Sequence, residues 1–83
     1  MEKKDIKPGM ILSITTDREQ LKVKIGGLYP EYTNLFYADI ISGRLDGKRA
    51  RVSAYDDKLD VFQPDRHDLV ARVPYRQVVQ IDI

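Results

Sequence analysis

The chain has 83 residues, with 14 Lys and Arg against 13 Asp and Glu, a formal net charge of +1 and no cysteine. One domain over residues 1–83 is expected at this length, and the lack of cysteine excludes a disulfide scaffold, a thiolate metal site and a cysteine nucleophile. The charge balance excludes a domain that binds nucleic acid by net charge alone, although a local basic patch stays open. No apolar run approaches the length of a membrane span, so the default expectation is a cytoplasmic protein without membrane contact.

The first half of the chain predicts a charged lead-in and three strands. Residues 1–9 end in Pro8-Gly9, a dipeptide that marks a turn. Apolar residues then recur at every second position, which is typical of half-buried strands. The Gly26-Gly27 pair is expected to end the second strand, and an irregular segment over residues 28–35 follows it. The predicted strands are Met10–Thr15, Leu21–Ile25 and Phe36–Leu45.

The second half predicts a hairpin, a short strand and a closing unit of two strands. Asp46-Gly47 stands between two strand-like runs, a pattern that favours a two-residue type I′ turn. Pro74 cannot donate a hydrogen bond within a sheet, and its fixed φ suits the start of a single 3₁₀ turn over the residues that follow. The predicted strands are Lys48–Tyr55, Leu59–Phe62, Leu69–Val73 and Val79–Ile83.

These elements predict an all-β fold. Helical periodicity is absent over any window of ten or more residues, and turn signals recur every eight to twelve residues. Short strands at that spacing are typical of antiparallel barrels and sandwiches. We therefore expect a small antiparallel β-barrel of about five to seven short strands, with one 3₁₀ turn near Pro74.

Two stretches resemble known families of small barrels. The run Val73–Val79, in which a strand passes through a proline and a helical turn into a last strand, resembles the end of Src-homology-3-like barrels and implies their topology. That family binds Pro-rich peptides through a pair of tryptophans and an Ala-Leu-Tyr-Asp-Tyr-type motif, which this chain lacks. Residues Ala54–Val61 are similar to a turn of Sm-like RNA-binding barrels, with Asp60 where that family has Asn, which implies shared barrel geometry.

A basic hairpin is the first candidate for function. Arg49 and Arg51 share one face of a predicted strand, and Arg44 lies across the Asp46-Gly47 turn from them. A protruding basic ribbon can follow phosphates, for which guanidinium groups are well suited. The alternative is that these are solvated outward positions that protect a strand edge from aggregation. The residues concerned are Arg44, Lys48, Arg49 and Arg51.

Aromatic residues form the second candidate. Exposed aromatic rings beside basic residues bind single strands by stacking, and tyrosines also anchor protein interfaces. The alternative is a small core beneath a long loop, to which we assign Phe36. Tyr29 and Tyr32 stay open between exposure and burial. The cluster consists of Tyr29, Tyr32, Phe36 and Tyr37.

No stretch predicts catalysis, a metal or a small-molecule cofactor. His67, the only histidine, lies between Asp65 and Asp68 in a single local cluster, whereas metal sites need ligands that converge from several elements. We interpret this segment as a hydrated loop. The acidic residues around Asp56 and Asp60 lack the spacing of a calcium loop and are expected to form a solvated turn.

The sequence therefore predicts a binding module without enzymatic activity. The first hypothesis is nucleic-acid binding, to RNA or DNA, by the four basic residues of the hairpin together with Tyr29 or Tyr32. The alternative is a protein-interaction or oligomerisation module in a larger assembly, because strand edges are available for pairing with a protein partner or a second copy. The basic ribbon leads us to favour nucleic acid.

Overall fold

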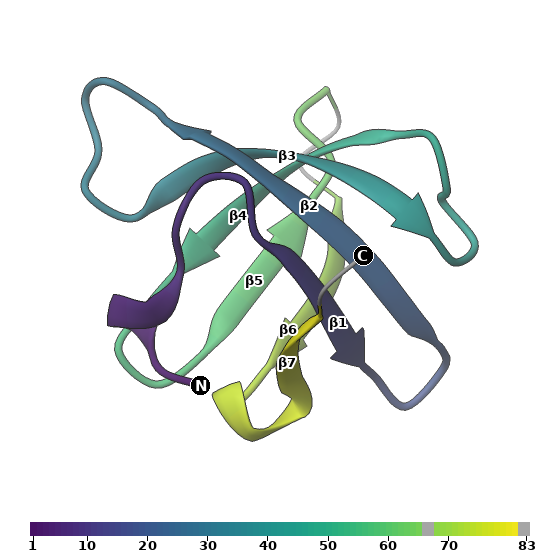
Figure 1. Cartoon of the computed structure of the whole chain (residues 1–83). Helices are drawn as coiled ribbons and strands as arrows, with labels where there is room; N and C mark the ends of the chain where they lie inside the picture. The colour runs from purple at the N-terminus through teal and green to yellow at the C-terminus, as the bar shows by residue number, and fades with distance from the viewer. Residues whose placement is uncertain (66–67, 82–83) are drawn as a thin grey trace.

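The computed structural model describes residues 1–65 and 68–81, which form one antiparallel sheet of seven strands that curls into a half-barrel (Figure 1). The order across the sheet is β6-β5-β4-β3-β2-β1-β7, so β6 and β7 are its edge strands. The predicted all-β, small antiparallel fold is confirmed. The strands are β1 (Ile11–Thr15), β2 (Gln20–Leu28), β3 (Leu35–Ser42), β4 (Arg49–Ala54), β5 (Leu59–Phe62), β6 (Leu69–Val73) and β7 (Val78–Ile81).

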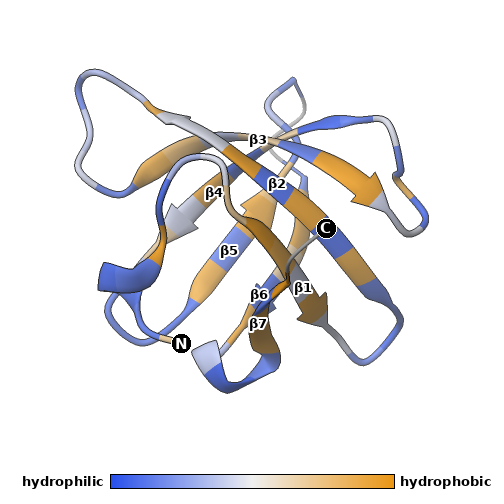
Figure 2. Ribbon diagram, in the orientation of Figure 1, coloured by the Kyte–Doolittle hydropathy of each residue, from blue (hydrophilic) through white to orange (hydrophobic). Residues whose placement is uncertain are grey.

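The core lies on the concave side of this sheet. Figure 2 shows hydrophobic and hydrophilic residues alternating along several of the strands. Phe36, which the sequence assigned to a small separate core, is 5 % exposed and belongs to this main core. Each fully buried aliphatic side chain stabilises the fold by roughly 1.5–3 kcal/mol through removal of apolar surface from water. The largest fully buried side chains are Leu12, Ile14, Leu21, Val23, Ile25, Ile40, Val52, Leu59 and Val61.

The closing unit has the predicted form. Strand β6 leads through Pro74 into the 3₁₀ turn η2 (Tyr75–Gln77), and β7 then pairs with β1. The side chain of Tyr75 is 8 % exposed, and its hydroxyl donates a hydrogen bond to the Tyr55 carbonyl. Burial, and to a lesser degree the charge of Asp56, raises the pKa of Tyr75 to about 12. A second 3₁₀ turn, η1 (Lys3–Asp5), lies in the segment predicted as a lead-in.

Two local predictions about glycines are wrong. The Gly26-Gly27 pair does not end β2, which continues to Leu28 through an irregularity in its pairing with β3. Asp46-Gly47 does not form a two-residue turn, because β3 already ends at Ser42 and residues 43–48 form the β3–β4 loop. Gly43 and Gly47 both adopt positive φ, at 108° and 90°, so the chain leaves the strand earlier than the alternation of apolar residues suggests.

The acidic residues are not one solvated turn. Asp60 is 4 % exposed and accepts two hydrogen bonds of 2.9 Å from Arg72 Nε and Nη2. The two residues face each other across the β5–β6 pairing, and the hydrogen bonds with Asp60 raise the pKa of Arg72. Asp56 remains exposed, with its Oδ1 3.4 Å from Lys3 Nζ. The solvated-turn interpretation was wrong for Asp60, because the strand register brings a cation to it.

Candidate functional site

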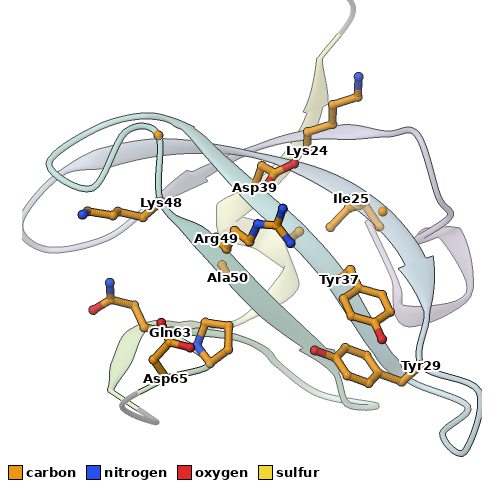
Figure 3. A pocket seen from close by; sticks show the side chains of 14 residues that line it. Lys24, Ile25, Tyr29, Tyr37, Asp39, Lys48, Arg49, Ala50, Gln63 and Asp65 are labelled. Carbon is orange, nitrogen blue, oxygen red and sulfur yellow. The ribbon is translucent and has the colours of Figure 1, made fainter.

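An open groove of about 680 Å³ lies on the outer face of β2, β3 and β4. The β3–β4 loop and the segment after β5 form its rims. Figure 3 shows Lys48 opposite Gln63 and Asp65 at one end, Arg49 near the middle, and two tyrosines at the other end. We call this feature the outer groove; its polar and aromatic lining residues are Lys24, Tyr29, Tyr37, Asp39, Lys48, Arg49, Gln63 and Asp65.

Strand register brings the middle of the outer groove together. Lys24 on β2 pairs with Asp39 on β3, and Asp39 pairs in turn with Arg49 on β4. Side chains of directly paired residues lie on the same face of a sheet, and here that face is the solvated one. Tyr37 precedes Asp39 by two residues and shares its face, because side chains alternate along a strand.

The aromatic end of the outer groove is a set of ring contacts. Tyr29, from the β2–β3 connection, stacks on Tyr37 with ring centroids 3.9 Å apart and planes 17° apart. The guanidinium carbon of Arg51 lies over the Tyr29 ring, 5.1 Å from its centroid. Tyr32 meets Tyr29 edge-on, with centroids 6.4 Å apart. Although Tyr29 covers part of it, Tyr37 remains 50 % exposed.

The cations of the outer groove, unlike Arg44 and Arg72, have no carboxylate partner among the described residues. Among the residues that the structure describes, no ion pair within 4.0 Å involves Lys24, Lys48 or Arg49. All three side chains are exposed. In contrast, Arg72 is bound to Asp60 and Arg44 lies 3.6 Å from Glu19. The unpaired cations of the groove are therefore available to an external anion.

Arg51 has a different environment. It is half-buried, and its Nε atom is buried without a hydrogen-bond partner. Its neighbours across the sheet are Tyr37 on β3 and Phe62 on β5. The guanidinium group thus lies among large side chains, and its contact with Tyr29 is a cation–π interaction.

The structure brings some of the predicted site residues together and separates others. Lys48, Arg49 and Tyr29 line the outer groove, and Arg51 contacts Tyr29. Arg44 does not line the groove, because its backbone N–H donates to Glu19 Oε1 at 2.9 Å and its side chain follows the same carboxylate. Tyr32 is 54 % exposed beside Tyr29, also outside the groove lining.

The sequence hypothesis omitted several residues of the outer groove. Lys24 was recognisable as an outward residue of its strand, but nothing local connects it to Arg49. Tyr37 was in the aromatic cluster, yet its alternation alone did not show that Tyr29 folds against it. Asp39 and Asp65 add two carboxylates to the groove, so its positive charge is partly offset.

Neither a metal-ion site nor a membrane-spanning helix is found in the part of the chain that the structure describes. No group of three or more His, Asp and Glu side chains there could hold a metal ion, and His67 of the acidic loop lies outside the described residues. None of the described helical segments is long and apolar enough to cross a membrane. No protein-family model, curated protein or solved structure matches this chain with statistical significance.

Proposed function

We propose that this protein is a non-catalytic module that binds nucleic acid along the outer groove. The observation that carries the proposal is the presence of three exposed, unpaired cations and a stacked tyrosine pair in one groove. Nucleic acid is the ligand class that offers both anionic groups and flat aromatic faces at short intervals. The cations concerned are Lys24, Lys48 and Arg49.

The charges of the groove determine how strong such binding can be. Lys and Arg bind phosphate oxygens by charge-assisted hydrogen bonds, and the Arg49 fork can make two at once. Three phosphate contacts give a slope of log K against log salt of roughly −2 to −3. Asp39 and Asp65 weaken the local field, so we expect modest affinity that is readily lost as salt is raised.

A direct test is fluorescence anisotropy with labelled oligonucleotides of random sequence at low salt. The double variant Lys48→Gln/Arg49→Gln is expected to bind at least ten-fold more weakly than the parent. The control is Arg76→Gln, which removes an exposed cation of η2 outside the groove and is expected to leave affinity within two-fold. No binding by the parent protein at low salt, to single or double strands, would reject the proposal.

Arg44→Gln separates the structural proposal from the one drawn from the sequence. Arg44 flanks the same loop as Lys48 but is held by Glu19 and lies outside the groove lining. Its removal should therefore change affinity much less than removal of Arg49. Equal losses for the two variants would place the binding surface along the whole loop and not in the groove.

A second candidate function, protein interaction or oligomerisation, is favoured by the edges of the sheet. β6 and β7 each pair with one strand, and exposed apolar side chains lie on both, at Leu69 (51 % exposed) and Val79 (58 % exposed). An unprotected edge can pair with another chain. We also propose a Src-homology-3-like topology for the closing unit, in which η2 connects the two edge strands β6 and β7. Sedimentation that shows a monomer at all concentrations would count against self-association.

A further inference from the structure

We infer that the outer groove takes single-stranded nucleic acid, with one unpaired base stacked on Tyr37 and an adjacent phosphate bound by Arg49. This inference rests on the proposed function and specifies its ligand. It would exclude duplex as the main substrate. Three features carry it: an exposed ring at the aromatic end, a rigid support behind that ring, and the arrangement of charge beside it.

The exposed ring is Tyr37. It lines the groove, and Tyr29 already occupies part of its surface, yet half of the side chain remains accessible to solvent. Tyr29 covers one face of the ring, so a base would stack on the opposite face. A base of any kind can stack on such a surface, since every base has a π face.

The support behind the ring comes from two neighbours. Tyr29 stacks on Tyr37 at a centroid distance of 3.9 Å, and the Arg51 guanidinium lies over Tyr29. Arg51 itself is half-buried on β4, which pairs with β3 on one side and with β5 on the other. We assign Arg51 the role of a positioning residue: it holds Tyr29 against Tyr37, so that little side-chain freedom is lost when a base arrives.

Arg49 lies at the position that a neighbouring phosphate requires. Arg51 is directly opposite Tyr37, and Arg49 is opposite Asp39, so Arg49 is the diagonal neighbour of Tyr37 on the same face. Diagonal neighbours across a sheet are about 7–8 Å apart, a separation that one nucleotide can span between its base and its phosphate. Lys48 continues the cationic side of the groove away from the ring.

A duplex cannot satisfy this arrangement. Its base faces are stacked inside the helix, so Tyr37 would gain no stacking partner. Its two phosphate strands would also bring Asp39 and Asp65 close to like charge, because both carboxylates lie among the cations of the groove. In a single strand the same carboxylates can instead accept hydrogen bonds from exocyclic amino groups of bases.

The first experiment uses the substitution Tyr37→Trp as a fluorescent reporter, because the chain contains no tryptophan of its own. The indole keeps an aromatic stacking surface, and its fluorescence is expected to be quenched when a base stacks on it. Titration with a single-stranded 12-mer should quench the signal, and the matched duplex should bind at least ten-fold more weakly. Parallel DNA and RNA 12-mers of the same sequence distinguish the two sources of unpaired bases.

The outcomes separate this inference from the proposed function. If neither single strand nor duplex binds, both fail. If the duplex binds as tightly as the single strand, or if binding leaves the indole fluorescence of the Tyr37→Trp variant unchanged, the nucleic-acid proposal stands and the single-strand inference is overturned.

Further variants test the ring and its support. Tyr37→Leu should weaken single-strand binding by about 5- to 150-fold, the range that loss of one base–aromatic stack produces. Tyr37→Phe, which keeps the ring, should remain within about two-fold of the parent, as should the control Tyr55→Leu, an exposed tyrosine outside the groove lining. Single-strand affinity that survives Tyr37→Leu unchanged would overturn the inference.

Arg51 requires a readout that a purely structural role would not change. Arg51→Met keeps an unbranched, apolar stem and should leave the protein folded. Combined with the Tyr37→Trp reporter, it should weaken binding of the single strand and reduce the quench of the indole at saturation, because Tyr29 no longer holds the ring in place. A full quench at saturation would reject the positioning role.

Discussion

Two regions on the outer face of one sheet use their cations in opposite ways. On β5 and β6, Arg72 makes two 2.9 Å hydrogen bonds to Asp60, a carboxylate that is 4 % exposed. On β2 to β4, Lys24 and Arg49 lie on both sides of Asp39, and none of the described ion pairs within 4.0 Å involves these three residues. The first arrangement stabilises the protein, whereas in the second arrangement the charged side chains are exposed to solvent without ion-pair partners.

The difference shows which charges the fold requires. A buried acceptor without a hydrogen bond is costly in free energy, so the fold requires Arg72 as the partner of the buried Asp60. Exposed cations that repel one another contribute little to folding or oppose it slightly. Unpaired cations beside a stacked pair of tyrosines therefore add little to stability, which is why we propose the outer groove, and not the Arg72 region, as the ligand-binding surface.

The largest expected effect is the loss of Arg72. Arg72→Met leaves the Asp60 carboxylate without its two hydrogen bonds, and a buried acceptor left unpaired costs about 1–3 kcal/mol of unfolding free energy. Urea denaturation followed by circular dichroism measures the change. Arg76→Met, at an exposed position of η2, is the control and should change stability by less than about 0.5 kcal/mol. Oligonucleotide binding should be unchanged in both variants; a stable Arg72→Met would remove the distinction between the two regions.

The next effect concerns the loop that carries Lys48. Gly43→Ala should lower stability by about 1–2 kcal/mol, because an L residue is strained at positive φ and because its Cβ would lie 2.8 Å from Glu19 Oε1. Glu19 is the carboxylate that holds Arg44 and the start of the loop.

Gly47→Ala is the matched control for that substitution. Gly47 also has positive φ, at 90°, but nothing lies within 4 Å of an added Cβ. The two variants share backbone strain, so the difference between their unfolding free energies reports the contacts of the added Cβ with Glu19 and Leu21. Equal losses would show that these contacts add nothing to the backbone strain.

The sequence predicted where the strands lie, but not which strands pair or which side chains meet across the sheet. Period-two alternation identified inward residues such as Val23 and Val52, because burial on one face of a strand leaves a local pattern. The pairing of strands leaves no local pattern in the sequence. Lys24 and Arg49 come together only because both pair with β3. Asp60 looked like part of a solvated turn for the same reason, since Arg72 is twelve residues away in the chain.

The predicted two-residue turn was wrong because two glycines, Gly43 and Gly47, shape this loop. Asp46-Gly47 has the composition of a two-residue hairpin turn, and the sequence placed Arg44 across that turn from Arg49 and Arg51. Positive φ at Gly43 as well as Gly47 creates a longer loop. The Arg44 side chain therefore pairs with Glu19, whereas Lys48 lines the outer groove. The outcome depends on a carboxylate 25 residues distant from Arg44, which no local signal reports.

A smaller effect comes from Tyr75, a buried polar group that is neutral. Its raised pKa, about 12, means that the protonated tyrosine is favoured by the fold. This contribution to stability is fully present below pH ~10, the ordinary pKa of tyrosine, and is lost as pH rises through the folded-state value. Stability should therefore fall as pH is raised from about 10 to 12.

Tyr75→Phe tests that assignment. At neutral pH it should cost about 0.5–1.5 kcal/mol, because the Tyr55 carbonyl loses its hydrogen bond from the hydroxyl. The fall in stability at alkaline pH should be shallower than in the parent, with Tyr32→Phe, an exposed tyrosine, as control. An identical alkaline profile for Tyr75→Phe would show that another group governs it.

The smallest expected effect on stability is at Arg49, and it decides the comparison. Arg49→Gln removes an exposed cation that none of the described carboxylates pairs with, so the unfolding free energy should change by less than about 0.5 kcal/mol. The same substitution should reduce the magnitude of the salt slope of oligonucleotide binding by about 0.7–0.9, the loss of one phosphate contact. Arg72→Met should show the reverse: a large change in stability and an unchanged slope. If Arg49→Gln instead destabilised the protein and left the slope intact, the cations of the outer groove would be structural, and the contrast with Arg72 would no longer support a ligand.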